Sequence, residues 1–280
     1  MTTRPVTDSA PSDTVQAPPA ARLAFRLPAP IANAGFFVVS LAILVLIWTL
    51  LAAVRTDLPR PAVIGVALAE LFARPWYQDG PNDQGILNLL LSSLTRVFSG
   101  FAIGAVIAVP LGILMGSVPI FKRILDPIVQ LMRPVSPLAW FPIGLTLMSK
   151  AEPATVFIIA VTALWPTIIN TSFGVSGLPA DYKNVARVFN FTPAQYVMRV
   201  LLPYALPHIV TGMRISFGIA WMVIVAAEML SGKSGIGFYA WDAWNAGNLA
   251  HVVCAILIIG VTGFLFDQLF NLAQKKVTYA

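Results

Sequence analysis

Several hydrogen-bonding side chains are set into the most apolar segments of this chain. Their hydroxyl, indole and amide groups form hydrogen bonds of modest net energy, so they can hold a small solute weakly enough to release it. These residues are Ser136, Trp140, Trp165, Thr167, Asn170 and Thr171. Arg96 lies about three turns into another apolar segment and is the charged residue best suited to face an anion. The alternative is that the aromatic rings pack and the hydroxyls bond to their own helices.

The sequence lacks the spacings that hydrolytic, metal or nucleotide chemistry needs. It contains no HExxH or GxSxG motif and no close carboxylate pair. His208 and His251 lie in different apolar segments, and the single Cys254 excludes a disulfide framework. The only GKS, Gly232–Ser234, has Ala227 where a phosphate-binding loop requires glycine, so we interpret it as a turn. An intramembrane enzyme would therefore have no catalytic constellation to use.

The elements that carry the polar residues are long apolar windows. Hydrophobic residues make up 58% of the 280-residue chain and charged residues only 11%, against about 25% charged in soluble domains. The mean hydropathy is +0.79. Because a hydrocarbon core of ~30 Å needs ~20 apolar residues per helix, each charge-poor window is interpreted as a span. The windows are Ala34–Val54, Ile86–Gly116, Ile124–Met148, Pro153–Val175, Tyr204–Leu230 and Asn248–Leu272. They predict an all-α polytopic membrane protein with six transmembrane helices.

The same windows give the domain boundaries. We expect a disordered cytoplasmic tail over 1–33, a first transmembrane helix over 34–54, an extracytoplasmic segment over 55–85, a helical core over 86–274 and a cytoplasmic tail over 275–280. Within the extracytoplasmic segment, Leu58–Arg74 is short and amphipathic. This pattern predicts a helix that lies along the membrane interface.

The distribution of lysine and arginine predicts the orientation, because these residues are enriched in cytoplasmic loops. With the N-terminus inside, the cytoplasmic side carries Arg4, Arg22, Arg26, Lys122, Arg123, Lys183, Arg187, Arg199, Lys275 and Lys276. The opposite side carries only Arg55, Arg60, Arg74, Lys150 and Lys233. This asymmetry favours both termini in the cytoplasm. It also accounts for the net charge of +6 without a nucleic-acid partner.

The window Ile124–Met148 contains three closely spaced prolines, Pro134, Pro137 and Pro142. Each proline removes a backbone donor and frees a carbonyl about one turn earlier. At membrane depth, such groups must be satisfied by protein or by a water-lined cavity. The pattern predicts either a broken helix that lines a substrate path or a kink that serves packing alone.

Four glycines in the second window form two pairs in which three residues separate the members. They are Gly100, Gly104, Gly112 and Gly116. Small residues at this spacing let helices approach closely in lipid. They predict close packing either within the bundle or against a second subunit.

Other charged residues fall near the ends of the windows, where long side chains can reach the interface at low cost. They are Asp126, Arg133, Arg214, Glu228 and Asp267. For Asp126, Arg133, Arg214 and Asp267 we favour ion pairs or interface anchors over a functional role. Glu228 is expected close to the outer side.

A polar island, defined as residues 178–203, interrupts the apolar sequence between two windows. Pro179 can start a helix over Ala180–Phe189, and Asn190 suits the left-handed residue that ends it. Thr192, Pro193 and Gln195 then form a capping box with proline at the first helical position. The second helix is expected to stop at Pro203. The island therefore predicts two short packed helices, a form suited to docking another protein.

The spacing within the island resembles the EAA---G---------I-LP motif of ABC importer permeases. Ala186, Leu202 and Pro203 match this motif, and Val200 is a conservative change. The departures are Asn184 for Glu, Val185 for Ala and Asn190 for Gly. The Asn190 change is compatible with the turn, whereas Asn184 removes a charge that relatives use.

The resemblance extends over roughly 58–272. It is carried by the segments Ser93–Phe101, Leu125–Ile143, Thr162–Val175, Leu206–Leu230 and Gly235–Trp244. These segments are similar to the nitrate, bicarbonate and cyanate branch of permeases, which is related to the taurine and alkanesulfonate permeases. The WPTIINT and WDAW segments most resemble nitrate permeases. Taurine, sulfonate, bicarbonate and cyanate remain alternatives, and a channel or a secondary transporter is the alternative of a different class.

The resemblance implies a type I ABC importer permease fold with a cytoplasmic coupling loop over 178–203, in a multi-pass protein of the bacterial inner membrane. It implies a second permease subunit, with a homodimer as the first choice, and an extracytoplasmic substrate-binding protein. A separate cytoplasmic ATPase would bind ATP and Mg, and this chain would hold no cofactor and contact only these proteins and membrane lipids.

The resemblance also implies roles for individual residues. Contact with the ATPase is expected from Asn184, Val185, Ala186, Arg187, Asn190, Thr192, Pro193 and Pro203. The translocation path is expected to be lined by Arg96, Ser136, Trp140, Trp165, Thr167, Asn170 and Thr171.

Overall fold

The computed structural model describes residues 29–55 and 57–278, and all of its regular elements are helices. In chain order they are α1 (Ala29–Val54), α2 (Pro61–Ala73), α3 (Ile86–Ser117), α4 (Pro119–Met132), the 3-10 helix η1 (Pro137–Trp140), α5 (Phe141–Met148), α6 (Ala151–Ser176), α7 (Ala180–Val188), α8 (Pro193–Tyr196), the π-helix η2 (Val197–Leu201), α9 (Leu202–Ser231), α10 (Ile236–Asn245) and α11 (Leu249–Thr278). The helical class predicted from the sequence is confirmed for the described residues.

Five helical stretches among the described residues are long and apolar enough to cross a membrane. They are Gly35–Val54, Ile86–Ser117, Ala151–Ser176, Pro193–Ser231 and Leu249–Val277. Each corresponds to a predicted span.

Helices extend into both predicted tails. Helix α1 begins at Ala29, so the last residues of the expected tail over 1–33 are helical, and residues 1–28 lie outside the described part. Helix α11 continues to Thr278, so most of the tail expected over 275–280 is also helical.

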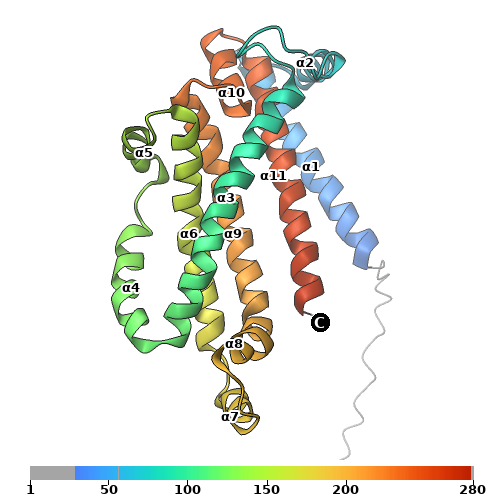
Figure 1. Cartoon of the computed structure of the whole chain (residues 1–280). Coiled ribbons are helices and arrows are strands. Elements are labelled where there is room, and N and C mark those ends of the chain that lie inside the picture. The colour runs from blue at the N-terminus through green and yellow to red at the C-terminus, as the bar shows by residue number, and fades with distance from the viewer. Residues whose placement is uncertain (1–28, 56, 279–280) are drawn as a thin grey trace, which may run out of the picture. The chain divides into compact units, whose positions relative to one another are not determined.

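The predicted span Ile124–Met148 is not one helix but α4, a break, η1 and α5 (Figure 1). Ser136 has extended backbone angles of φ −57° and ψ 129°. A residue before proline is biased out of the helical region, so Pro137 accounts for the break at this point. Pro142 falls in the first turn of α5, where the missing N–H has no helical partner to lose.

Helix α6 packs against both α3 and α9, and these three helices form the centre of the bundle (Figure 1). The four glycines of α3 make the approach to α6 possible. A Cβ on Gly104 would lie 2.7 Å from the carbonyl oxygen of Ala160, and one on Gly116 would lie 2.7 Å from that of Ser172. Gly100 and Gly112 face α6 in the same way. The pairs therefore serve packing within the bundle.

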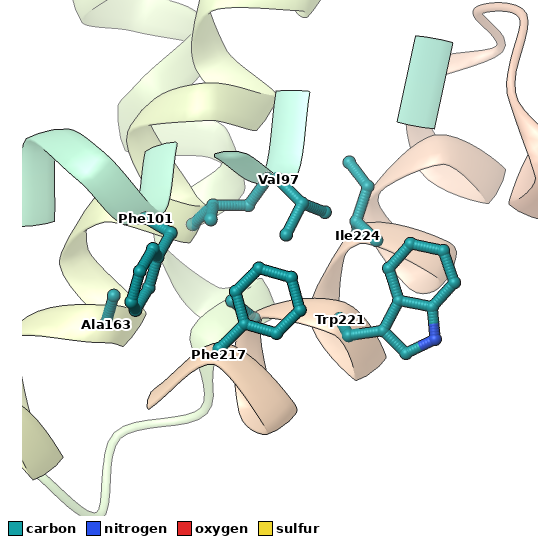
Figure 2. Close-up of a cluster of buried hydrophobic side chains, with 8 residues drawn as sticks. Val97, Phe101, Ala163, Phe217, Trp221 and Ile224 are labelled. Carbon is teal, nitrogen blue, oxygen red and sulfur yellow. The ribbon is translucent and has the colours of Figure 1, made fainter. Parts of the chain in front are cut away.

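An aromatic cluster fills the space between α3, α6 and α9. Figure 2 shows Val97 and Phe101 of α3 with Phe217, Trp221 and Ile224 of α9. The rings of Phe101 and Phe217 meet edge to face with centroids 5.3 Å apart, a favoured aromatic geometry. This cluster fixes α9, which carries part of the site described below.

The second helix of the island does not stop at Pro203, contrary to expectation. Helix α8 continues through the π-helix η2 into α9, and the whole stretch Pro193–Ser231 is helical. In η2 the N–H of Leu202 reaches the carbonyl of Val197, five residues back. Proline normally ends a helix because it lacks an N–H donor and its ring clashes with the preceding turn. The wider turn of η2 accommodates Pro203, so the helix continues without a break.

Candidate functional site

A cavity of about 400 Å³ opens where the interrupted helix meets α6 and α9. The break contributes Arg133, Pro134, Val135 and Ser136, and η1 contributes Pro137 and Trp140. Helix α6 adds Val161, Thr162, Trp165, Pro166, Ile169 and Asn170, and α9 adds Ile215 and Ile219. The proline-rich break therefore lines a cavity.

Four of the predicted path residues meet in this cavity. They are Ser136, Trp140, Trp165 and Asn170. The hydroxyl, indole and amide groups come from two segments that are well separated in the sequence. The apolar remainder of the wall is formed by proline, valine and isoleucine. Asn170 also donates a hydrogen bond of 2.8 Å to the carbonyl of Pro166, which fixes its amide on α6.

Arg133 adds a positive charge to the same cavity. Its side chain is exposed, and no ion pair is recorded for its guanidinium among the described residues. Of the ion pair or interface anchor that its sequence position favours, the ion pair is not found among the described residues, and the side chain lines the cavity. The signal that could have found it is its position directly before Pro134, at the start of the break.

Three predicted path residues lie outside the cavity. The hydroxyl of Thr167 is fully buried and lies 2.7 Å from that of Ser216 on α9. Thr171 is also fully buried, and its side chain fills the space beside Gly112 of α3. Both threonines therefore take part in packing between helices, and the hydroxyl of Thr167 bonds to a neighbouring helix instead of its own.

Arg96, the third residue outside the cavity, is engaged in a buried polar cluster. Its guanidinium donates to Glu228 Oε1 at 2.8 Å and to the carbonyl of Ser234 at 2.6 Å. Its Nε also lies 3.6 Å from Glu152 on α6. A guanidinium that is only 8% exposed and paired with a buried carboxylate has no free charge to offer an anion.

Glu228 is fully buried and joins α9 to the start of α10. Ser93 of α3 donates to this carboxylate at 2.8 Å, and the N–H of Gly237 donates to it at 3.0 Å. The N-terminus of a helix favours a negative charge, so α10 starts against a carboxylate that it helps to stabilise. Gly235 is required here, because a Cβ at this position would overlap the Glu228 carboxylate.

Of the remaining charged residues, Arg214 and Asp267 form the ion pair expected of them. Arg214 donates through Nε and Nη2 to the two carboxylate oxygens of Asp267, each at 2.8 Å, and so ties α9 to α11. Asp126 is half-buried and accepts a hydrogen bond from Gln130 on the same helix.

The island forms a compact helical loop. Helix α7 covers Ala180–Val188 with Pro179 at its N-cap, and Asn190 adopts a left-handed conformation with φ 49°. The N–H of Phe191 reaches back to the carbonyl of Ala186, a closure typical of helix ends with a left-handed residue. The predicted left-handed Asn190 is confirmed.

The capping box at the next helix is also confirmed. Gln195 N–H donates to the Thr192 hydroxyl at 3.3 Å, and Thr192 N–H donates to the Gln195 side chain at 2.9 Å. Pro193 occupies the first turn of α8. The loop is thus specified locally at both of its helix ends.

The residues of α7 divide between two faces. Ala186 is only 5% exposed and packs inward, whereas Val185 is 54% and Val188 is 77% exposed. Asn184 is exposed as well. Val185 and Val188 therefore form an exposed apolar tip of α7, which is available for contact with another protein.

The fold of this chain is that of ABC importer permeases of type I. It matches a chain of the MetNI methionine ABC transporter in inward-facing conformations with a TM-score of 0.62 at 18% identity, over 69% of this chain and 95% of that one. It also matches a chain of an amino acid ABC transporter crystallised with histidines, with a TM-score of 0.58 at 16% identity, over 75% of this chain and 96% of that one.

The chain belongs to the family of binding-protein-dependent transport system inner membrane components, whose model matches residues 108–279. A nitrate import permease protein, NrtB, from Synechocystis sp. is 40% identical over 243 residues, which are 86% of this chain and 88% of that protein. A bicarbonate transport system permease protein, CmpB, from Synechococcus elongatus is 42% identical over 209 residues, which are 74% of this chain and 75% of that protein. The chain is therefore a multi-pass inner-membrane permease subunit of an ABC importer and not an enzyme.

Proposed function

We propose that this permease carries a small planar oxyanion of single negative charge, with nitrate as the first candidate. Nitrate and bicarbonate both have this shape and charge, and the relatives named above divide between them. The nitrate relative aligns over a larger share of this chain than the bicarbonate relative does, 86% against 74%. Bicarbonate is therefore the second candidate, and cyanate, taurine and sulfonates follow.

The observation that carries this proposal is Arg133, which has no ion pair within the described part of the chain and lines a cavity with neutral hydrogen-bond donors. One positive charge attracts a monovalent anion. Hydroxyl, indole and amide groups then bind its oxygens with net energies of about 0.5–1.5 kcal/mol each, which permits release. We assign Arg133, Ser136, Trp140, Trp165 and Asn170 to the translocation path.

We propose further that α7 and α8, together with η2, form the coupling loop that docks on a separate cytoplasmic ATPase. The capped ends and the exposed Val185 and Val188 support this assignment, whereas a passive channel has no use for such a loop. ATP and Mg would bind to that ATPase. An extracytoplasmic binding protein and a second copy of this permease would complete the importer.

The orientation that we propose keeps both termini in the cytoplasm. It follows from the excess of lysine and arginine on that side. The interrupted stretch α4–η1–α5 would serve as the sixth crossing, because broken helices are tolerated at membrane depth where they line a cavity. In this orientation the GKS turn after α9 faces outward, with Gly232 at φ 63° as the left-handed cap of α9.

The test is uptake into liposomes that contain the purified permease with its ATPase and binding protein. We expect ATP-dependent accumulation of isotope-labelled nitrate, and at least tenfold less bicarbonate at equal concentration. Preferential uptake of bicarbonate would move the assignment to the second candidate. Uptake of neither anion, with ATP hydrolysis intact, would contradict the substrate class.

A further inference from the structure

A second cavity, of about 460 Å³, lies between the island and the ends of α3 and α6. We refer to it as the loop pocket. Its apolar wall includes Val175, Ala186, Phe191 and Leu201, and its polar groups come from Lys183, Arg187, Ser117 and Tyr196. The loop pocket shares no residue with the cavity that holds Arg133.

The charge in the loop pocket is positive and uncompensated. Lys183 and Arg187 lie four residues apart on α7, so both side chains project on the same side of the helix. No acidic residue lines the pocket, and no ion pair of either cation is recorded among the described residues. The tip of α7 that carries Val188 points away from the loop pocket, since Val188 is 77% exposed and does not line the pocket.

The loop pocket lies at the level where helices leave the membrane. Gly116 and Ser117 are at the end of α3, and Val175 is at the end of α6. Helix α6 has 26 residues, about 39 Å at ~1.5 Å per residue, which exceeds a hydrocarbon core of ~30 Å only by a turn or so at each end. A pocket at its last residues therefore lies at headgroup depth, on the side that we propose to be cytoplasmic.

We infer that the loop pocket binds the headgroup of an anionic phospholipid. A volume of 460 Å³ could hold on the order of fifteen water molecules at about 30 Å³ each, far more than a small oxyanion fills. A phosphate ester with its glycerol and first acyl carbons matches both the cationic groups and the apolar wall. Basic pockets between helix ends on the cytoplasmic side suit such lipids.

The lipid binds through Lys183 and Arg187 and packs its glycerol and upper acyl carbons on the apolar wall. This assignment replaces, for Arg187, the ATPase contact that the resemblance implies. It thereby joins α7 to the ends of α3 and α6. Anionic lipid then acts as a third element of the loop, beside its two helix caps. This inference rests on the proposed orientation but not on the identity of the transported anion.

The experiment is native mass spectrometry of the full-length permease in detergent with equal amounts of phosphatidylglycerol and phosphatidylcholine of the same chain length. We expect about tenfold preferential retention of phosphatidylglycerol by the unmodified protein. The double variant Lys183→Gln, Arg187→Gln should reduce this preference to below about threefold. The exchanged pair Lys183→Arg, Arg187→Lys should retain it, because the charge is preserved.

The matched control is Lys275→Gln, Lys276→Gln, which removes two basic residues at the end of α11 and should leave the preference unchanged. Equal retention of the two lipids by the unmodified protein, or loss of the preference in the α11 control alone, would overturn the inference. Displacement of phosphatidylglycerol by excess glycerol 3-phosphate would show a soluble phosphate site and would overturn it as well.

Neither the retention of lipid nor its displacement by glycerol 3-phosphate involves transport. Failure of nitrate uptake with intact lipid selectivity would count against the proposed substrate alone, and the reverse result would count against the lipid site alone. Unfolding of the variants is monitored by thermal melting in the same detergent, and the charge-preserving pair keeps the test informative if the glutamine variant is unstable.

Discussion

Arg96 and Arg133 carry the same charge in opposite surroundings. Arg96 is buried, and its guanidinium is shared between Glu228 and Ser234. Arg133 is exposed to a cavity lined by neutral donors. The position of Arg96 far inside an apolar window favoured it as the residue that faces an anion, because burying a charge far from the ends of a span costs more free energy. That cost is offset by Glu228, a partner that lies more than a hundred residues away in the chain and that local patterns do not reveal.

Replacement of Arg133 by glutamine tests the cavity directly. We expect uptake of the anion to fall about tenfold or more, since hydrogen bonds from a charged donor contribute about 1.5–3 kcal/mol. Assembly with the ATPase should be unchanged. The matched control is Arg123→Gln, another exposed arginine of the same segment that does not line the cavity. Equal uptake by the two variants would remove Arg133 from the path.

Glu228 is expected to be a determinant of stability. Glu228→Ala leaves Arg96 and the N-terminus of α10 without their partner, and breaking a buried pair of this kind costs about 3–5 kcal/mol. Gly235→Ala should destabilise the same junction, because the added Cβ would overlap the carboxylate. Thermal unfolding in detergent measures both effects. Glu152→Gln is the control, since this side chain is 67% exposed and lies at the edge of the cluster, and a comparable loss there would contradict the assignment.

Among the elements, α7 depends most on a single backbone conformation. Asn190 has φ 49°, a region that asparagine and glycine adopt readily and a β-branched residue does not. We expect Asn190→Gly to support transport at least as well as the unmodified chain. Asn190→Val should reduce copurification of the ATPase and uptake together. Similar behaviour of the two variants would show that the turn does not matter for coupling.

The outward tip of α7 provides a second test at this scale. Val188→Glu puts a charge on a 77% exposed apolar position and should abolish ATPase copurification while the permease remains folded. Val188→Thr, nearly the same shape without a charge, should retain it. Ala186→Glu is unsuitable for this purpose, because Ala186 packs inward and the change would disrupt the loop itself. Retained copurification with Val188→Glu would exclude the tip as a docking surface.

Local signals explain why the island was predicted so closely. A capping box, a left-handed asparagine and a proline in a first turn each act within a few residues, so the sequence contains nearly all of their cause. The sequence does not predict the continuation of α8 through η2 into α9, because proline normally ends a helix and no local pattern indicates the wider turn that accommodates Pro203. In the interrupted span the opposite holds, because Pro134 and Pro137 do break the helix between α4 and η1.

For the whole molecule, the orientation can be tested by labelling. In a Cys254→Ala background, Lys233→Cys in the turn after α9 should react with an impermeant maleimide on intact cells. Lys275→Cys at the end of α11 should react only after the cells are permeabilised. Both lysines are exposed, so access is governed by sidedness. The opposite pattern would invert the proposed topology and would move the loop pocket to the outer leaflet.

The cavity itself could be predicted only in part. Four of its polar residues were identified because they lie in the two segments that the proline break and α6 supply. Thr167 and Thr171 share that helix but turn toward α9 and α3, and they lie outside the cavity. Which side of a helix faces a cavity depends on its neighbours, and in an apolar chain the hydrophobic pattern does not distinguish lipid from protein.

The unbroken helix through η2 has a mechanical consequence. From Pro193 in the island to Ile219 in the cavity wall it runs about 39 Å at ~1.5 Å per residue. A movement imposed on the island would therefore reach the cavity wall through one continuous helix, and the π-turn of η2 with Pro203 and Pro207 is the place where that helix can bend.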